Sequence, residues 1–164
     1  MFALFQGKAE QVLLSGPALS EILRAVLGKG VPVRFQAKGF SMSPFIKNGD
    51  VVTISPLEDT SPGVGDVIAF VHEGTDRLYV HRVIRKKGEF YIPKGDSILG
   101  ADGSVSRKDV LGFVTRVERN GKDVFLGLGP ERFVIAFLGC RGLLLPFIHS
   151  LRKVVRSILK RSAD

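Results

Sequence analysis

The stretch KGFSMSPFIKNGD at residues 38–50 carries two serine hydroxyls, Ser41 and Ser43, on either side of Met42. A serine hydroxyl is a weak nucleophile at neutral pH, and it becomes reactive when a neighbouring base takes its proton. The chain offers three histidines as such bases. The turn therefore holds a candidate nucleophile whose chemistry depends on which histidine the fold brings to it.

The run LYVHRVI has the alternation of a strand, which places Tyr79, His81 and Val83 on one face. Apolar strand neighbours can hold an imidazole in one rotamer. Free histidine titrates near pH 6.5, so His81 can accept a serine proton and return it to a leaving amine. His72, beside the turn HEGTD, and His149, in a basic tract, lack this setting.

Two acids follow His81 in KGDSILGADGSVSR: Asp96 after a glycine and Asp102 before one. A carboxylate beside the imidazole would orient it and stabilise its charged form. Each feature is common by itself, because Ser-Met-x-Pro and Asp-Gly are ordinary turn sequences and a strand histidine is usually a core residue. The residues themselves leave open which acid meets His81.

The elements that must position these groups are mainly strands. The chain has 164 residues and is 45% hydrophobic, which is enough for the core of one domain. We predict an antiparallel, partly open, barrel-like β domain over residues 31–130. Its strands are the short β-branched and aromatic runs between Gly, Pro and Asp turns: VPVRFQAK, DVVTIS, DVIAFVH, RLYVHRVI, EFYIP, VLGFVTRVER and DVFL.

Helices are expected on both sides of the β domain. The run SGPALSEILRAVLGKG has a proline suited to a first helical turn, an apolar stripe and two closing glycines, so residues 1–30 form an N-terminal helical segment. Residues 131–164 form a basic amphipathic helical tail, in which LLLPFIHSLRKVVRSILK has helical period. Its apolar face comprises Leu144, Phe147, Ile148, Leu151, Val154, Val155, Ile158 and Leu159, and its other face carries Arg152, Lys153, Arg156 and Lys160.

Charge and cysteine content narrow the function classes. The formal net charge of +8 favours nucleic acid, anionic lipid or an acidic partner without choosing among them. Cys140 is the single cysteine, so no intrachain disulfide can form, and we expect a buried thiol there. We expect neither a metal nor a cofactor. The N-terminal apolar run is too short for a signal peptide, and no stretch reaches the roughly 20 uncharged apolar residues of a spanning helix, although residues 133–148 come close.

The order of short motifs is more specific than any one of them. G-x-S-M-x-P, GD, GD, HRV, KGD, D and VLGFV follow one another over about half the chain. This order resembles the signal peptidase I superfamily of serine peptidases. Bacterial signal peptidases and LexA-like self-cleaving proteins use a Ser/Lys pair, whereas the archaeal and endoplasmic-reticulum type signal peptidases use histidine. His81, followed by Arg82, is similar to the histidine branch.

The resemblance implies a role for each matched residue. Ser41 corresponds to the nucleophile, His81 to the general base, Asp102 to the triad acid, and Asp96 to a second acid that is important in this branch. It also implies a mainly β peptidase core whose cleft binds substrate as an added strand.

Two further residues are candidates for contact with substrate. Gly39 supplies no side-chain donor, so we expect backbone N–H groups at Ser41 and nearby to stabilise the oxyanion. Met42 is expected to form an adaptable apolar wall for small substrate side chains.

The chain departs from this family at its N-terminus. Signal peptidases of the branch are commonly anchored by a transmembrane helix that precedes the serine motif, and we read no such transmembrane helix in residues 1–40. The C-terminal tail has the composition of a segment lying on an anionic bilayer. Equally, its helices could pack on the β domain. We expect a membrane-associated or cytoplasmic protein.

Three functions from different classes follow. The leading one is a Ser/His endopeptidase that cleaves a precursor polypeptide or signal peptide at a membrane surface. The second is a self-cleaving LexA-like regulator, for which residues 1–40 lack a full helix-turn-helix and an Ala-Gly or Cys-Gly bond. The third is a noncatalytic basic β module that binds lipid or nucleic acid, for which Phe35, Tyr79 and Tyr91 on predicted strands give sparse support. We expect no nucleic-acid partner.

Overall fold

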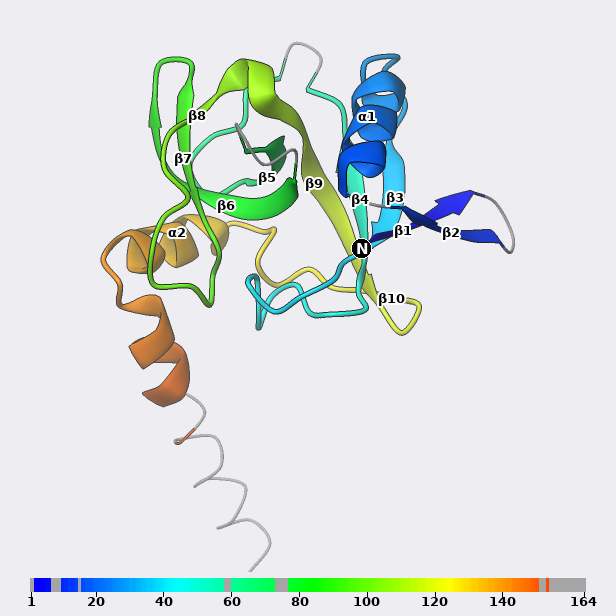
Figure 1. The fold of residues 1–164 in the computed structure, drawn as a ribbon. Coiled ribbons are helices and arrows are strands. Elements are labelled where there is room, and N and C mark those ends of the chain that lie inside the picture. The colour runs from blue at the N-terminus through cyan, green and yellow to red at the C-terminus, as the bar shows by residue number, and fades with distance from the viewer. Residues whose placement is uncertain are drawn as a thin grey trace, which may run out of the picture.

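A single antiparallel sheet dominates the computed structural model, which describes residues 2–6, 10–14, 16–57, 60–72, 77–150 and 153 (Figure 1). The strand order is β2-β1-β3-β4-β9-β5-β6-β7-β8, and β10 pairs with β9. The sheet curls into a half-barrel that carries an N-terminal helix and C-terminal helices, so the predicted fold class is confirmed. The strands are β1 Phe2–Gln6, β2 Glu10–Leu14, β3 Val33–Gln36, β4 Val51–Ser55, β5 Val67–Val71, β6 Leu78–Lys87, β7 Phe90–Lys94, β8 Val105–Ser106, β9 Val110–Arg119 and β10 Lys122–Asp123.

The long strand β9 bends the sheet. It pairs with β4 along one part and with β5 along another, and the register shifts between Thr53 and Ile54 and between Ala69 and Phe70. Such irregularities increase local twist and let a sheet curl. Gly112 lies where β9 crosses β4, and a Cβ there would come 2.4 Å from the carbonyl oxygen of Ser55. The close approach of the two backbones therefore requires glycine at this position.

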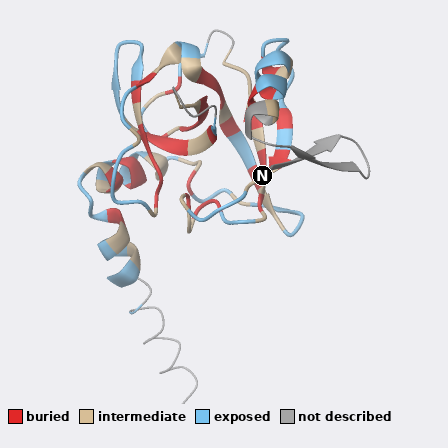
Figure 2. Ribbon diagram, in the orientation of Figure 1, coloured by how far each residue is buried: buried red, intermediate tan, exposed pale blue. Residues whose placement is uncertain are grey.

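The curled sheet separates two apolar clusters, and β6 contributes to both. Val83 is fully buried in one cluster and Tyr79 packs against it, whereas Val80 packs against the other. The alternation read from LYVHRVI is thus present in the strand. Figure 2 shows the buried residues concentrated on the central strands.

The N-terminal segment contains more than the predicted helix. Helix α1, Gly16–Leu27, packs through Leu23 and Leu27 into the cluster that contains Phe35 and Val52. Before it, β1 and β2 pair as a hairpin, and β1 continues the sheet beyond β3. Within the described part of residues 1–30, helix is therefore confined to α1, and the sequence analysis assigned no strand to this segment.

Two short strands also differ from the prediction. The run DVFL was assigned to a strand, but β10 ends at Asp123, and Phe125 is largely exposed in the loop that follows. Strand β8 was not predicted; its two residues pair with the start of β7.

The C-terminal segment begins with two short helices. Helix α2, Arg132–Cys140, and the helical segment Leu144–Ser150 meet at a bend of 114°. Ile135 and Leu144 bury themselves against Phe45, with Ile148 packed beside them. The predicted tail residues after Ser150, apart from Lys153, lie outside the described residues. In the described ranges no single helix has the length and apolar character to cross a membrane, although this bent pair passes by length and composition together.

Candidate active site

Ser41 lies in a tight turn that follows β3. The turn is closed by its own backbone: Ser43 N–H donates to the carbonyl of Phe40, and Ile46 N–H donates to the carbonyl of Met42. Gly39 opens the turn with φ +100°, a backbone conformation that favours glycine, and its N–H donates to Oδ1 of Asn48. These bonds fix the backbone on both sides of the serine.

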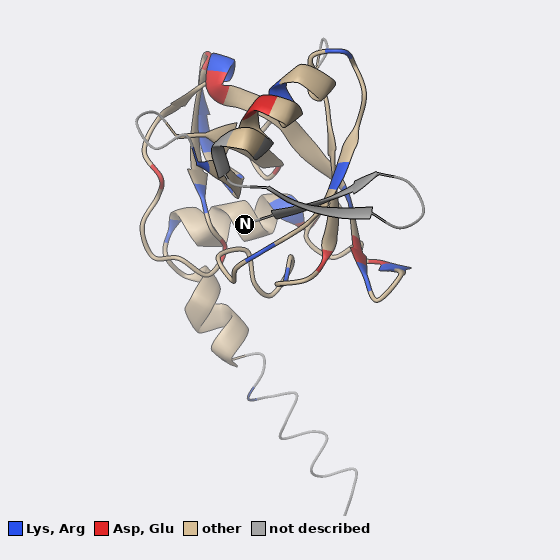
Figure 3. Ribbon diagram, turned by 45° about the vertical axis from the view of Figure 1, so that its right-hand side comes forward, with Lys and Arg blue, Asp and Glu red and all other residues tan. Residues whose placement is uncertain are grey.

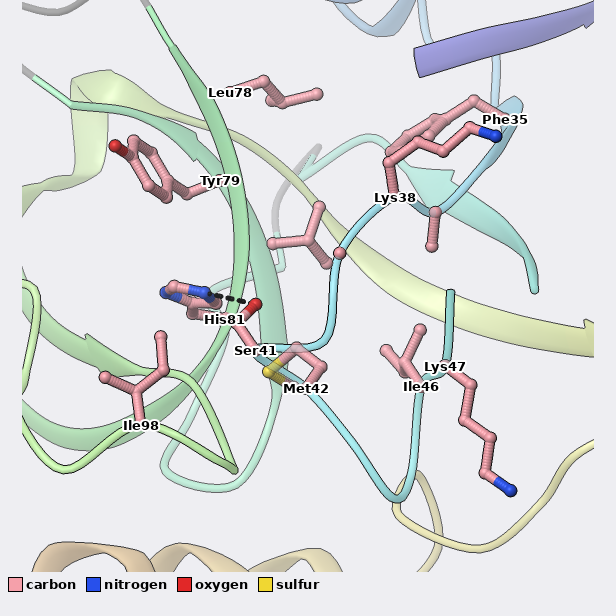
Figure 4. Close-up of a pocket in the computed structure, with 13 residues that line it drawn as sticks. Phe35, Lys38, Ser41, Met42, Ile46, Lys47, Leu78, Tyr79, His81 and Ile98 are labelled. Atoms are coloured by element: carbon pink, nitrogen blue, oxygen red, sulfur yellow. Dashed lines mark hydrogen bonds between the residues drawn. The ribbon is translucent and has the colours of Figure 1, made fainter. Parts of the chain in front are cut away.

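His81 reaches this serine from the middle of β6. The residue is 3% exposed, and Nε2 lies 2.9 Å from Oγ of Ser41 (Figure 4). The rings of Tyr79 and Phe70 lie beside the imidazole, with centroid distances of 5.8 and 6.3 Å. A serine O–H that donates to an unprotonated Nε2 is the arrangement that makes the hydroxyl nucleophilic.

Asp102 lies on the other side of the imidazole. The Nδ1–H of His81 donates to Oδ2 of Asp102 across 2.6 Å, a short bond of the kind formed with a charged acceptor. The backbone of Asp102 is itself fixed, because its N–H donates to the carbonyl of Pro93 and its carbonyl accepts from Nε2–H of His72 at 3.2 Å. The structure thus brings Ser41, His81 and Asp102 into one hydrogen-bonded array.

Asp96 has a different partner. It is 5% exposed, and its two carboxylate oxygens accept hydrogen bonds of 2.9 and 2.8 Å from Nε and Nη2 of Arg82. Arg82 also donates to the carbonyls of Gly65 and Gly127, both at 2.8 Å. Burial raises the pKa of the Asp96 carboxyl above its usual value, while the hydrogen bonds and charge of Arg82 act in the opposite direction. Asp96 therefore joins three segments of chain through Arg82, and its hydrogen bonds go to Arg82 rather than to His81.

The loop that follows β7 holds the serine turn from outside. Ser97 N–H donates to the carbonyl of Ser41 at 2.8 Å, and its Oγ–H donates to the carbonyl of Phe40 at 2.6 Å. Gly95 allows this approach, since a Cβ there would lie 2.8 Å from the Ser41 carbonyl oxygen. Ser97, His72 and Arg82 were not predicted from the sequence as positioning residues. For Ser97 the sequence held one signal, its position directly after the KGD motif.

A cleft of about 260 Å³ opens beside Ser41 and His81. Gly39 and Met42 both line it, and Met42 is 4% exposed because its far side packs into the core. Within the described part of the chain, the N–H groups of Ser41 and Met42 donate to no protein acceptor. They are available for an oxyanion. The remaining lining side chains are mostly apolar: Phe35, Ala37, Lys38, Ile46, Lys47, Leu78, Tyr79, Val80 and Ile98.

One wall of the cleft is an open strand edge. Residues 78–80 of β6 pair with β5 on one side, but the pairing of β6 with β7 starts at Arg82. In the described sheet, the other edge of residues 78–80 is left unpaired beside the cleft. An extended peptide can add to such an edge through backbone hydrogen bonds. This edge is suited to hold an extended polypeptide beside the array of Ser41, His81 and Asp102.

The described residues contain no group of three or more His, Cys, Asp or Glu side chains placed to hold a metal ion. Cys140 is half-buried, with its sulfur 3.2 Å from Nε of Arg85. Its thiol lies on α2, away from the array.

Comparison with known proteins supports the resemblance over part of the chain. Residues 30–97 match the family model described as Peptidase S24-like, a segment that contains Ser41, His81 and Asp96 and ends before Asp102. Searches of the curated proteins and of the solved structures give no match. Residues 30–97 are thus similar to Peptidase S24-like domains, which are part of the superfamily of LexA-like and signal peptidase I-like serine peptidases.

Proposed function

We propose that the protein is a serine endopeptidase in which Ser41 is the nucleophile, His81 the general base and Asp102 the acid that orients it. The observation that carries the proposal is the array itself: Oγ of Ser41 lies 2.9 Å from Nε2 of His81, and Nδ1 of the same ring lies 2.6 Å from Asp102. The serine and the histidine line a cleft with an open strand edge.

The geometry supports the usual two-step acyl transfer. His81 takes the proton of Ser41 as Oγ attacks the scissile carbonyl, and the carbonyl electron pair moves onto oxygen. The free N–H groups of Ser41 and Met42 are placed to stabilise that oxyanion. Collapse of the intermediate expels the amine, which receives the proton from His81. Water then enters and attacks the acyl carbon while His81 takes its proton; as the ester bond breaks, His81 returns that proton to Oγ of Ser41 and the acid product leaves.

The substrate we propose is a precursor polypeptide or signal peptide, cut after a small residue at a membrane surface. The cleft volume of about 260 Å³ lies below the range of most small-molecule sites and suits small side chains. Its walls are mostly apolar, with Met42 and Ile98 among them, and suit alanine-sized residues, although Lys38 and Lys47 also line the cleft.

The test compares two serines of the same turn. Purified wild-type protein and the variants Ser41→Ala and Ser43→Ala are incubated with a peptide library, and precursor lengths are compared in cells that carry each form. The wild type and Ser43→Ala should cleave, whereas Ser41→Ala should lose on the order of 10⁴-fold or more in rate. Cleavage by a folded Ser41→Ala variant at the wild-type rate would contradict the proposal.

The match to a Peptidase S24-like model favours self-cleavage as a second candidate. The two functions differ in how the speed of cleavage depends on protein concentration. In a self-cleaving protein the fraction of chains cut per unit time does not depend on concentration, and wild-type protein leaves the Ser41→Ala chain intact when the two are mixed. Cleavage of separate peptides with multiple turnovers identifies the endopeptidase.

A further inference from the structure

Helix α2 is apolar on both of its faces, but only one face is covered. Its inner face packs against the sheet through Ile135, Ala136 and Gly139, and buried Lys94 donates from Nζ to the Gly139 carbonyl at 2.7 Å. The opposite face carries Phe133, Val134 and Phe137, which are 54, 59 and 57% exposed. An exposed apolar face of this kind marks a surface that contacts another apolar phase.

The next helical segment extends this apolar surface. Leu143 and Phe147 are 51 and 54% exposed, while Leu144 and Ile148 hold the segment against the core. With nine and seven residues and a bend of 114° between them, these helices are short of the roughly 20 residues that span a bilayer. Their geometry fits helices lying in a membrane interface.

The charge of the chain is concentrated in the same region. Residues 132–163 contain seven Lys and Arg and no Asp or Glu, so they supply seven of the eight net positive charges. In the described helices the charges stand at the ends: Arg132 lies over the ring of Phe133 and Arg141 over the ring of Phe137. Residues 133–140 and 142–150 contain no Lys, Arg, Asp or Glu, and the ribbon of both helices is accordingly tan between these ends in Figure 3. Arg132 also pairs with Asp66 at 3.3 Å, so Arg141 is the arginine in the described helices that we expect to complement the anionic headgroups of a bilayer.

A second exposed apolar side chain lies between α2 and the candidate active site. Leu99, which is 82% exposed, lines a shallow hollow together with Arg85, Lys94, and Gly139 and Cys140 of α2. The preceding residue, Ile98, lines the catalytic cleft. The loop that holds the serine turn therefore lies beside α2.

We propose that Phe133, Val134, Phe137 and Leu99 enter the interface of an anionic lipid bilayer, so that the catalytic cleft opens at the membrane surface. The inference rests on the proposed function and deepens it by giving the peptidase an orientation toward membrane-inserted substrates. It narrows the expectation for the tail of residues 131–164 to the outer face of α2, and it adds Leu99, which lies outside that tail.

The chain has no tryptophan, which allows a direct test with one reporter at a time. The tryptophan fluorescence of Phe137→Trp and of Leu99→Trp should shift to shorter wavelength on vesicles of phosphatidylcholine with phosphatidylserine. Lipids with bromine-labelled acyl chains should quench the fluorescence of both variants. Phe90→Trp is the matched control, since Phe90 is 54% exposed and begins β7 at the turn of the β6–β7 hairpin, which points away from α2 (Figure 1). Its emission should not change.

Vesicle sedimentation measures what the surface contributes to binding. The triple variant Phe133→Ser/Val134→Ser/Phe137→Ser should bind anionic vesicles at least about a hundredfold more weakly, whereas Phe90→Ser should bind like wild type. Arg141→Gln, neutral lipid and high salt should each weaken binding.

Vesicle binding does not depend on catalysis, so Ser41→Ala should bind vesicles like the wild type. If wild-type protein binds vesicles but cleaves no peptide, the proposed peptidase function is rejected and the membrane surface is retained. Unquenched emission from the Phe137→Trp and Leu99→Trp variants, or binding unchanged in the folded triple variant, overturns the membrane surface. A blue shift that grows with protein concentration in the absence of vesicles also overturns it, since a second copy then covers the face.

Discussion

The imidazole of His81 and the carboxylate of Asp102 share a hydrogen bond of 2.6 Å, although 21 residues separate them in the chain. The next residue of β6, Arg82, points to the opposite side of the strand and binds Asp96. Two acids from one loop thus serve adjacent residues of one strand, and their substitutions should have different consequences.

Asp102→Asn should reduce the rate while leaving the protein folded. The partly exposed carboxylate orients Nδ1–H, and an amide there removes the charge that stabilises the imidazolium. We expect kcat to fall by about a thousandfold or more with little change in the melting temperature. Asp96→Asn should instead lower the melting temperature, because it leaves Arg82 buried without its charged partner. An Asp96→Asn variant that melts normally but is inactive, beside an active Asp102→Asn variant, would assign the acid to Asp96.

The single variants Ser41→Ala and His81→Ala and the double variant should have nearly the same residual rate. The two side chains act as one unit through the 2.9 Å bond, so removing the second after the first costs little. Single-turnover rates with matched circular dichroism spectra check this. Additive losses, with the double variant slower by the product of both factors, would indicate that the two residues act separately.

The sequence was informative about the site where local pattern determines geometry. Ser41 and His81 could be predicted because one lies in a recognisable turn and the other in an alternating strand. Alternation also places Arg82 opposite His81, so a buried acid that pairs with Arg82 cannot also face the imidazole. Asp96 and Asp102 can be distinguished in this way only when the burial of Asp96 is known. That burial results from packing between residues distant in the sequence.

The strands were predictable where they are long and regular, from β3 to β7 and at β9. The β1–β2 hairpin was missed because its pairing with β3 depends on contacts between residues distant in the sequence. Strand β8 has two residues and exists only as a partner of β7. Short edge elements of this kind are stabilised by their neighbours rather than by their own propensity.

The Arg82–Asp96 pair should behave as a coupled unit in a double-mutant cycle. Arg82→Met leaves a buried carboxylate unpaired and should cost about 3–5 kcal/mol of unfolding free energy, and Asp96→Asn should cost a similar amount. The double variant should be markedly more stable than the sum of the two losses predicts, since neither charge remains buried alone. Urea unfolding measures all four states. The exposed pair Arg116–Asp123 is the control, and its cycle should show little or no coupling because solvent screens both charges.

Ser97→Ala should weaken catalysis by loosening the serine turn. The variant removes the hydroxyl that donates to the Phe40 carbonyl but keeps the N–H that donates to Ser41. We expect a roughly tenfold lower kcat with KM nearly unchanged, because the turn carries the nucleophile and the oxyanion donors. Ser97→Thr, which keeps a hydroxyl, should recover most of the rate. A change confined to KM would show that Ser97 acts on substrate binding instead.

Glu131 should make the stability of the α2 region depend on pH in the acid range. The N–H of Gly127 donates to Oε1 at 2.6 Å and that of Gly129 at 3.1 Å. The Gly127 bond is the largest cause that lowers the pKa of Glu131 below its usual value of 4.5. Since the pKa is lower in the folded state, this contribution is present above about pH 4.5 and is lost as the pH falls through the folded-state value.

Thermal melts of wild-type protein and Glu131→Gln between pH 7 and pH 3 test this sign. The wild type should be more stable at neutral pH, and the difference should shrink as the carboxylate is protonated. Glu89→Gln is the control, because the Glu89 side chain is 71% exposed and meets Arg107 only at 3.8 Å, so its melts should follow the wild type at each pH. A gap between wild type and Glu131→Gln that stays constant down to pH 3 would mean that the charge of Glu131 does not stabilise the loop. Because Gly127 also accepts a hydrogen bond from Arg82, the same loss should loosen the segment behind the candidate site.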